Sequence, residues 1–407
     1  MVSVDMRTRL DTDVVLIDPE TFMSGDLHEL LDRNGELAAR GASLVGAKAL
    51  GIDVEGTRFT LEPTDRTIEM RRGTAAARVV VELDRGSFSD LVQDLQTPQT
   101  LATSLVTRLP MADHFRWLKW WPVLRAIIDG RPIHEPGDVD FFDRDGEPLD
   151  LRRRFTADDS DDEIAHFLAE AGFLHLEGWW PAEMMAEISA DMDRALPLYH
   201  PGDERSWWAT TGDGTERCVR MRFFEEHSGA AHGLLEDPRH LRIGDITGDG
   251  HVARTRVHGV NAIEALEKPL DVVSGISDLP WHKDCSLGRH SYDCCAMTTG
   301  ISVTGADHRS GQLAVVAGSH RANVQPNFIH PYLDLPVVPL PTGVGDVTVH
   351  LSCTLHMSYA PIDRERRVMY TGFSLPGERG NKVGADLGSV RENAHLNVSQ
   401  TPAALHH

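Results

Sequence analysis

The chain lacks any apolar run approaching the ~20 residues that cross a bilayer, and positive charge is scarce. Its 407 residues hold 40 Lys and Arg against 62 Asp and Glu, a formal net charge of −22. This charge repels nucleic-acid phosphates and anionic membrane surfaces. The N-terminal stretch also has no apolar signal core. We therefore expect no membrane insertion and no nucleic-acid partner, and we expect a cytoplasmic location.

Cysteines are few and show no paired spacing. The chain has five of them, and none forms a CxxC pair, so neither a disulfide framework nor a zinc ribbon is indicated. We expect them to be reduced and buried: Cys218, Cys285, Cys294, Cys295 and Cys353.

The length favours two domains. Residues 1–130 are typical of a small α+β domain, with a helix over 26–50 and strands over 57–61, 67–70 and 78–83. Trp117, Trp120 and Trp121 then form an apolar stripe that Pro122 interrupts, and such a stripe is usually a packing surface. Residues 131–159 are rich in Asp, Gly, Pro and Arg, as expected of a linker.

Residues 160–395 begin with helices and end in strands. Ser160 and Glu163 form a capping box, Gly172 is suited to end that helix, and Pro181 is placed to begin the next one. Short β-branched segments separated by glycines follow: FLHL, GQLAVVAGSH, GDVTVHL and RRVMYTGFSL. We expect an α+β protein whose second domain is a β-sandwich or barrel, with a flexible tail at 396–407.

A metal site is indicated at His282 and Asp284, which present an imidazole and a carboxylate to one point if they lie in a strand. His356, in a later strand-turn unit, supplies a third ligand. Two histidines and one carboxylate leave three positions open, which suits Fe(II) that binds a cosubstrate and O2. The HxD pair alone is weak evidence, because the chain holds 21 histidines and 62 acidic residues.

A dicarboxylate site is indicated by Arg367 and Ser358. Arg367 follows His356 in the next strand, where a guanidinium can bind a carboxylate through two hydrogen bonds. Ser358 lies two positions after His356 and can add a hydroxyl. Because the strand register is uncertain by one residue, Arg366 is the alternative partner.

These motifs together resemble the phytanoyl-CoA dioxygenase family, in the order in which that family carries them, over about residues 160–376. LPWHKD is similar to the proximal metal motif, SGQLAVVAGSHR to a conserved turn, and GDVTVHLSCTLHMSYAPIDRERRVMY to the segment with the distal histidine and arginine. The resemblance implies a double-stranded β-helix (jelly roll) with Fe(II) and 2-oxoglutarate. It makes His282, Asp284 and His356 the metal ligands, and Arg367 with Ser358 the 2-oxoglutarate clamp.

The resemblance also bears on the reaction. Halogenase relatives replace the carboxylate ligand by a small residue, so Asp284 favours hydroxylation, with succinate and CO2 as coproducts. Thr298 or Thr299 can reach the cosubstrate, and Thr299 is our candidate, although packing explains it equally well. Gly300 stands where relatives often carry an aromatic residue, which predicts an enlarged pocket.

Substrate contacts are harder to predict. Arg220, Arg222 and Phe223 precede the core where relatives build the pocket wall, while Trp281 fits packing or substrate stacking. His350 is expected in the core or beside the metal ligands.

In the N-terminal domain, the segment RVVVELDRGSFSDLVQDLQTPQTLATSLVTRL has a strand, a turn with an acidic residue and two short helices, and it resembles the end of sterol-carrier-protein-like domains. With the tryptophans and Gly300, this resemblance favours a bulky, largely apolar substrate such as a terpenoid, sterol or lipid-like natural product. The same site is compatible with desaturation, epimerisation or cyclisation. A non-catalytic lipid carrier with a vestigial metal site is the alternative from another class. The expected partners are a small-molecule substrate and O2, and a homo-oligomer is compatible with the sequence.

Overall fold

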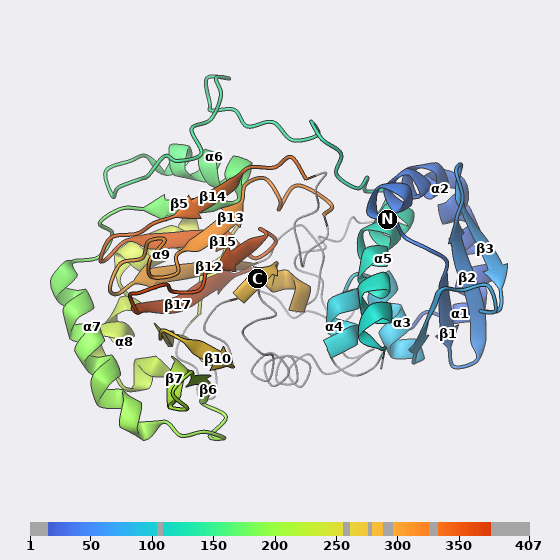
Figure 1. The fold of residues 1–407 in the computed structure, drawn as a ribbon. Helices are drawn as coiled ribbons and strands as arrows, with labels where there is room; N and C mark the ends of the chain where they lie inside the picture. The colour runs from blue at the N-terminus through green and yellow to red at the C-terminus, as the bar shows by residue number, and fades with distance from the viewer. Residues whose placement is uncertain are drawn as a thin grey trace.

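The structure, a computed structural model, describes residues 15–103, 109–254, 261–275, 279–287, 296–324 and 333–375. The expected tail at 396–407 lies outside these residues. A small N-terminal domain with its own sheet lies beside a larger, β-rich domain, and an extended segment joins them (Figure 1). None of the described helices is both long and apolar enough to cross a membrane.

The N-terminal domain packs helices on a four-stranded sheet of order β3-β2-β1-β4, in which β1 and β4 run parallel. The predicted helix and three strands are present. The helix ends earlier than expected, because Gly46 adopts a left-handed conformation (φ 65°), and strand β1 occupies the next segment. The elements are α1 (Pro19–Ser24), α2 (Asp26–Val45), β1 (Leu50–Val54), β2 (Thr57–Pro63), β3 (Ile68–Arg72), β4 (Val79–Leu83), α3 (Arg85–Val92), α4 (Pro98–Thr103) and α5 (Met111–Asp129).

The tryptophan stripe lies in α5, which continues through Pro122. Trp117 and Trp120 are fully buried in the core of this domain, and their indole N–H groups donate to the carbonyls of Pro98 (3.1 Å) and Lys48 (2.8 Å). Trp121 is buried as well. The predicted packing role is confirmed, and the stripe therefore offers no aromatic surface to a substrate.

The described core of this domain has little empty space. It holds a cavity of about 20 Å³ lined by apolar side chains, room for about one water molecule. An enclosed sterol or lipid does not fit such a space. This cavity is therefore too small to serve as a ligand chamber.

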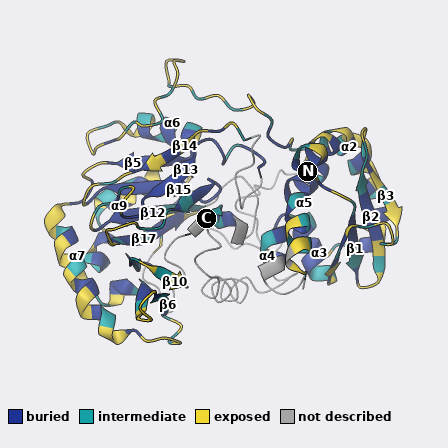
Figure 2. Ribbon diagram, in the orientation of Figure 1, coloured by how far each residue is buried: buried dark blue, intermediate teal, exposed yellow. Residues whose placement is uncertain are grey.

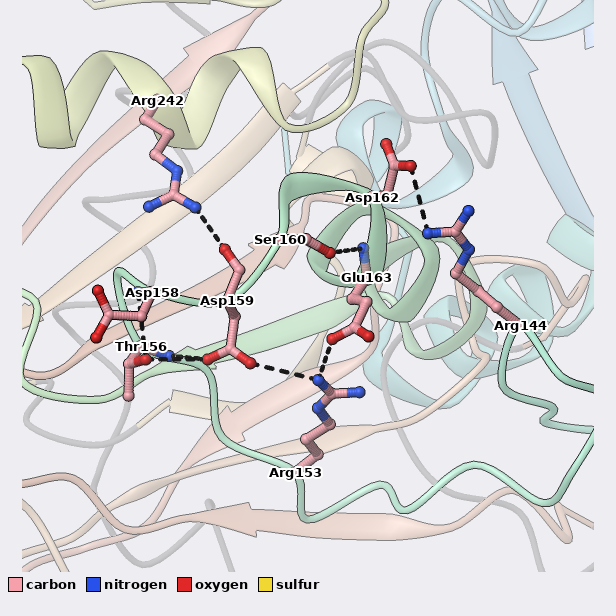
Figure 3. Close-up of polar contacts among 9 residues, drawn as sticks. All are labelled: Arg144, Arg153, Thr156, Asp158, Asp159, Ser160, Asp162, Glu163 and Arg242. Atoms are coloured by element: carbon pink, nitrogen blue, oxygen red, sulfur yellow. Dashed lines mark hydrogen bonds and ion pairs between the residues drawn. The ribbon is translucent and has the colours of Figure 1, made fainter.

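The larger domain starts at α6 (Asp161–Ala171), and Figure 3 shows how this helix begins. The Ser160 hydroxyl accepts a hydrogen bond from the Glu163 N–H at 3.3 Å. The Glu163 carboxylate pairs with Arg153 instead of returning to Ser160, so only half of the predicted capping box forms. Arg242 ties the preceding loop to a second helix by donating to the Asp159 carbonyl at 2.8 Å.

Two sheets make up the core of the larger domain. The larger sheet has the order β10-β6-β7-β9-β17-β12-β15-β5, with β8 beside β17, and the smaller has the order β11-β16-β13-β14. The helices and the early strands are β5 (Phe173–Leu176), α7 (Ala182–Ala195), η3 (Leu196–Leu198), β6 (Ser206–Thr211), β7 (Glu216–Met221), η4 (Phe224–Glu226), α8 (Gly229–Leu234), α9 (Pro238–Asp245), β8 (Val252–Ala253), β9 (Glu264–Lys268) and β10 (Val272–Ser274).

The remaining strands move between the two sheets along the chain. They are β11 (Leu279–His282), η5 (Asp284–Leu287), β12 (Ala296–Ser302), β13 (Leu313–Val316), β14 (Val337–Leu340), β15 (Val347–Leu351), β16 (His356–Ser358) and β17 (Arg366–Ser374). Strands β12, β15 and β17 belong to the larger sheet, and β11, β13, β14 and β16 to the smaller one. This antiparallel, alternating arrangement is a double-stranded β-helix, as expected.

The larger sheet is covered on both faces at its central strands, β12, β15 and β17, most of whose residues are buried (Figure 2). Its outer face packs on helices: Arg367 of β17 contacts Ser189 of α7. Its inner face turns to the smaller sheet: Arg366 contacts Ser358 of β16. In the N-terminal domain, α4 lies against η5, the turn that begins with Asp284.

Three cysteines lie in the described part of the chain: Cys218, Cys285 and Cys353. All three are buried, as predicted. Cys294 and Cys295 fall outside it.

Candidate metal centre

The structure brings the three predicted metal ligands together between the sheets. Pairing of β11 with β16 sets His282 opposite His356, with ring centroids 4.2 Å apart. Asp284 lies in the turn η5, after the end of β11. We had expected it in the same strand as His282, with both side chains on one face. Its Oδ1 lies 3.5 Å from His282 Nε2 and 3.6 Å from His356 Nε2. One ion can contact all three atoms.

The protonation states of the ligands suit a metal. Burial raises the pKa of Asp284, but the imidazoles of His356, His282 and His350 outweigh burial and hold this pKa well below its usual value. Burial, with the neighbouring His350 and His282, lowers the pKa of His356 well below the ordinary one. Near neutral pH the site therefore offers a carboxylate and a neutral imidazole, the forms that bind metals.

The backbone fixes the tautomer of His356. Its Nδ1 lies 2.9 Å from the carbonyl oxygen of Thr354, which can only accept a hydrogen bond. Nδ1 therefore carries the proton, and the Nε2 lone pair is directed at the cluster.

The second oxygen of Asp284 is surrounded by polar groups from the larger sheet. The Thr298 hydroxyl donates to Oδ2 at 2.8 Å, and His350 Nε2 lies 3.4 Å from the same oxygen. Thr298 and His350 are cross-strand partners in β12 and β15. Thr299, our candidate for cosubstrate binding, is fully buried on the opposite face of β12, so the structure does not bring it to the cluster.

A cationic site adjoins the metal cluster at Ser358. The Ser358 hydroxyl accepts from Lys268 Nζ at 2.7 Å and from Arg366 Nη2 at 3.1 Å. All three residues are buried, and Lys268 and Arg366 are cross-strand partners. Two residues of strand, about 7 Å, separate Ser358 from His356, a span that a five-carbon dicarboxylate can bridge.

Arg367 does not belong to this site. It lies on the outer face, where its guanidinium donates to the Ser189 carbonyl at 2.9 Å and pairs with Asp193 at 2.6 Å and Glu267 at 3.2 Å. Successive side chains of a strand point to opposite faces, so the alternative register is the one the structure adopts. The prediction for Arg367 was one residue too far along the chain.

Arg366 has a positive charge and an available N–H donor that could bind an anion. Burial lowers its pKa, yet a guanidinium stays charged at any ordinary pH. Its Nε has no hydrogen-bond partner among the described residues. Lys268 was missed in the sequence, because only the pairing of β9 with β17 places it beside Arg366.

The predicted substrate contacts separate into two groups. Arg220 of β7 shares the inner face, where its guanidinium lies 4.0 Å from the centre of the Trp207 ring and 3.1 Å from Glu264. Arg222 instead binds the Glu204 carbonyl and stacks on Phe223. The structure does not bring Arg222 or Phe223 to the metal cluster.

The structure does not support a substrate role for Trp281 or Gly300 either. Trp281 packs on the apolar cluster of Val316 and Leu355, which favours the packing interpretation. Gly300 does not open the pocket: a Cβ there would lie 3.0 Å from the Tyr370 ring and 2.9 Å from the Thr348 hydroxyl. Tyr370 thus fills the space that we expected to be empty.

Comparisons with known proteins give a family match and several similar solved structures. The profile of the family described as Phytanoyl-CoA dioxygenase (PhyH) matches residues 168–367. No curated protein sequence matches. Similar solved structures include the α-ketoglutarate-dependent epimerase SnoN from nogalamycin biosynthesis (19% identity, TM-score 0.42, 56% of this chain and 91% of that one). EctD from S. alaskensis, with 2-oxoglutarate and 5-hydroxyectoine, is another (17%, TM-score 0.43, 60% and 86%).

Proposed function

We propose that the chain is an iron(II)- and 2-oxoglutarate-dependent enzyme that hydroxylates a small organic molecule, because residues 168–367 match the phytanoyl-CoA dioxygenase family. The observation that carries the proposal is the convergence of His282 Nε2, Asp284 Oδ1 and His356 Nε2 on one point. Two neutral imidazoles and one carboxylate would hold Fe(II) and leave three positions open. When bound, the iron supplies the O2 chemistry that amino-acid side chains lack.

The chain's own residues would bind and orient the cosubstrate. Arg366, Lys268 and the Ser358 hydroxyl form a buried site with two positive charges and one hydroxyl for the distal carboxylate of 2-oxoglutarate. Two cationic side chains buried on one face are costly, and an anion from solution would offset part of that cost. The 2-keto acid end then faces the metal ligands.

The residues of the described site suit a substrate with polar substituents better than a purely apolar one. Three features had favoured an apolar substrate: the tryptophan stripe, Gly300 and an N-terminal ligand chamber. The tryptophans are core residues, Tyr370 covers Gly300, and the described N-terminal cavity is minute. Arg220 and Glu264 instead put a polar pair on the inner face, able to bind hydroxyl or carbonyl groups.

We also propose that the N-terminal domain covers one side of the metal centre. Its helix α4 contacts η5, whose first residue is Asp284. Asn323 further links the domains, because its side-chain amide donates to the Pro122 carbonyl at 2.9 Å. A covering domain would exclude water from the centre.

The test is a substrate screen under Fe(II), 2-oxoglutarate and O2, with succinate release and the product mass as readouts. Gain of one oxygen atom supports hydroxylation, whereas loss of two hydrogens means desaturation or cyclisation and an unchanged mass means epimerisation. Asp284→Ala, which leaves two neutral ligands, is the control and should release no succinate. Absence of Fe(II) and 2-oxoglutarate binding in the unaltered protein would overturn the proposal.

A further inference from the structure

His350 is a buried residue that the proposed function does not yet use. It is 2% exposed, and neither ring nitrogen has a hydrogen-bond partner among the described residues. A buried imidazole without partners costs free energy, so an ordinary core position would favour an apolar side chain. The ring instead lies in the cluster, 4.1 Å from the His356 ring centroid, with Nε2 3.4 Å from Asp284 Oδ2.

The two oxygens of Asp284 face different surroundings. Oδ1 lies nearest the ligand nitrogens of His282 and His356. Oδ2 faces the larger sheet, where Thr298 and His350 approach it from adjacent strands. The carboxylate is therefore oriented from both sides.

We propose that His350 is a positioning residue which, together with Thr298, holds Oδ2 of Asp284 away from the metal, so that Asp284 binds Fe(II) through Oδ1 alone. This inference rests on the proposed function. A carboxylate that is free to rotate can bind a metal through both oxygens and occupy a position that 2-oxoglutarate or O2 needs. The Thr298 hydrogen bond to Oδ2, with His350 Nε2 3.4 Å from the same oxygen, would keep that position open.

His350→Phe fills the same space without a donor, and His350→Gln restores an N–H group near the position of Nε2. Thr298→Val is the matched variant on the other strand. Each protein is titrated with Co(II) by calorimetry, its visible absorption spectrum reports the coordination geometry, and its apo melting temperature is recorded. Partners of metal ligands typically change metal affinity about 10- to 100-fold, and we expect a loss in that range for His350→Phe. We expect at least half of the loss, on a logarithmic scale, to be restored in His350→Gln.

The melting temperature separates positioning from packing. Because neither ring nitrogen makes a hydrogen bond among the described residues, and the contact with Asp284 Oδ2 is long at 3.4 Å, His350→Phe should melt at the same or a higher temperature while its Co(II) affinity falls. A lower melting temperature with Co(II) affinity within about threefold of the unaltered protein would make His350 a packing residue and overturn the inference.

A second result would overturn it as well. If the Co(II) spectrum loses a nitrogen ligand in His350→Phe and His350→Gln does not restore affinity, His350 is itself a ligand. Failure of the proposed function is distinct, since the unaltered protein would then bind neither Co(II) nor Fe(II).

Discussion

Arg366 and Lys268 are cross-strand partners in β17 and β9, and both donate to the Ser358 hydroxyl, at 3.1 and 2.7 Å. Like charges directly opposite each other in a sheet are destabilising. We propose that an anion binds between them, and the distal carboxylate of 2-oxoglutarate is our candidate.

Arg366→Leu should weaken 2-oxoglutarate binding. The distal carboxylate would lose its guanidinium in a desolvated site, a change on the order of 2–5 kcal/mol, so we expect the Kd to rise at least tenfold. Calorimetry on the Mn(II)-loaded protein measures it. Arg367→Leu is the matched control and should leave the Kd unchanged, because Arg367 contacts α7. A larger effect from Arg367→Leu would contradict the strand register.

Lys268→Met should show which end of the cosubstrate Lys268 binds. We expect a rise of roughly tenfold in the Kd of 2-oxoglutarate, since one of two cations is lost. The Kd of 2-oxovalerate, which has the same keto acid but no distal carboxylate, should change little. Equal weakening of both compounds would place Lys268 at the metal end.

The two site residues that were misplaced in the sequence share one cause. Arg367 and Thr299 point away from the cluster, whereas their neighbours Arg366 and Thr298, which the sequence offered as alternatives, lie at it. In a half-exposed strand, apolar and polar residues alternate, and this alternation identifies the inner face. Strands β12 and β17 are covered on both faces, so nearly all their residues are buried and the alternation is lost. Adjacent identical residues, Arg-Arg and Thr-Thr, then leave no chemical signal of direction.

Other parts could be predicted because the signal is local. The start of α6 depends on Ser160 and its end on Gly172, both of which act within one helical turn. The metal ligands were found because their motifs recur in order. Lys268 was missed because its role depends on the pairing of distant strands.

Gly300→Ala in β12 should disturb the proposed anion site at Arg366, which lies in the neighbouring strand β17. Its Cβ would lie 3.0 Å from the Tyr370 ring and 2.9 Å from the Thr348 hydroxyl, and Tyr370 is in the same strand as Arg366, four residues further along. We expect a loss of about 1–3 kcal/mol in unfolding free energy from overpacking, with weaker 2-oxoglutarate binding. Gly233→Ala, in an open position of α8, is the control and should be neutral or stabilising. Unchanged stability in Gly300→Ala would mean that Tyr370 moves freely.

His240 should make stability depend on pH. It is fully buried against Phe373, with ring centroids 4.7 Å apart, and burial lowers its pKa to about 4. The unfolded chain binds this proton near pH 6.5, so the folded state is favoured fully above that pH and loses stability as pH falls toward 4. The loss from one such histidine is on the order of 3 kcal/mol.

His240→Phe keeps the ring packing and removes the proton site. Urea unfolding between pH 8 and pH 4 should show a shallower decline of the unfolding free energy in this variant, with equal or greater stability at pH 8. Part of the decline should remain, because burial also lowers the pKa of His320 to about 4. Replacement of the exposed His28 by Gln should leave the decline unchanged. A decline in His240→Phe as steep as in the unaltered protein would mean that His240 takes up its proton without unfolding.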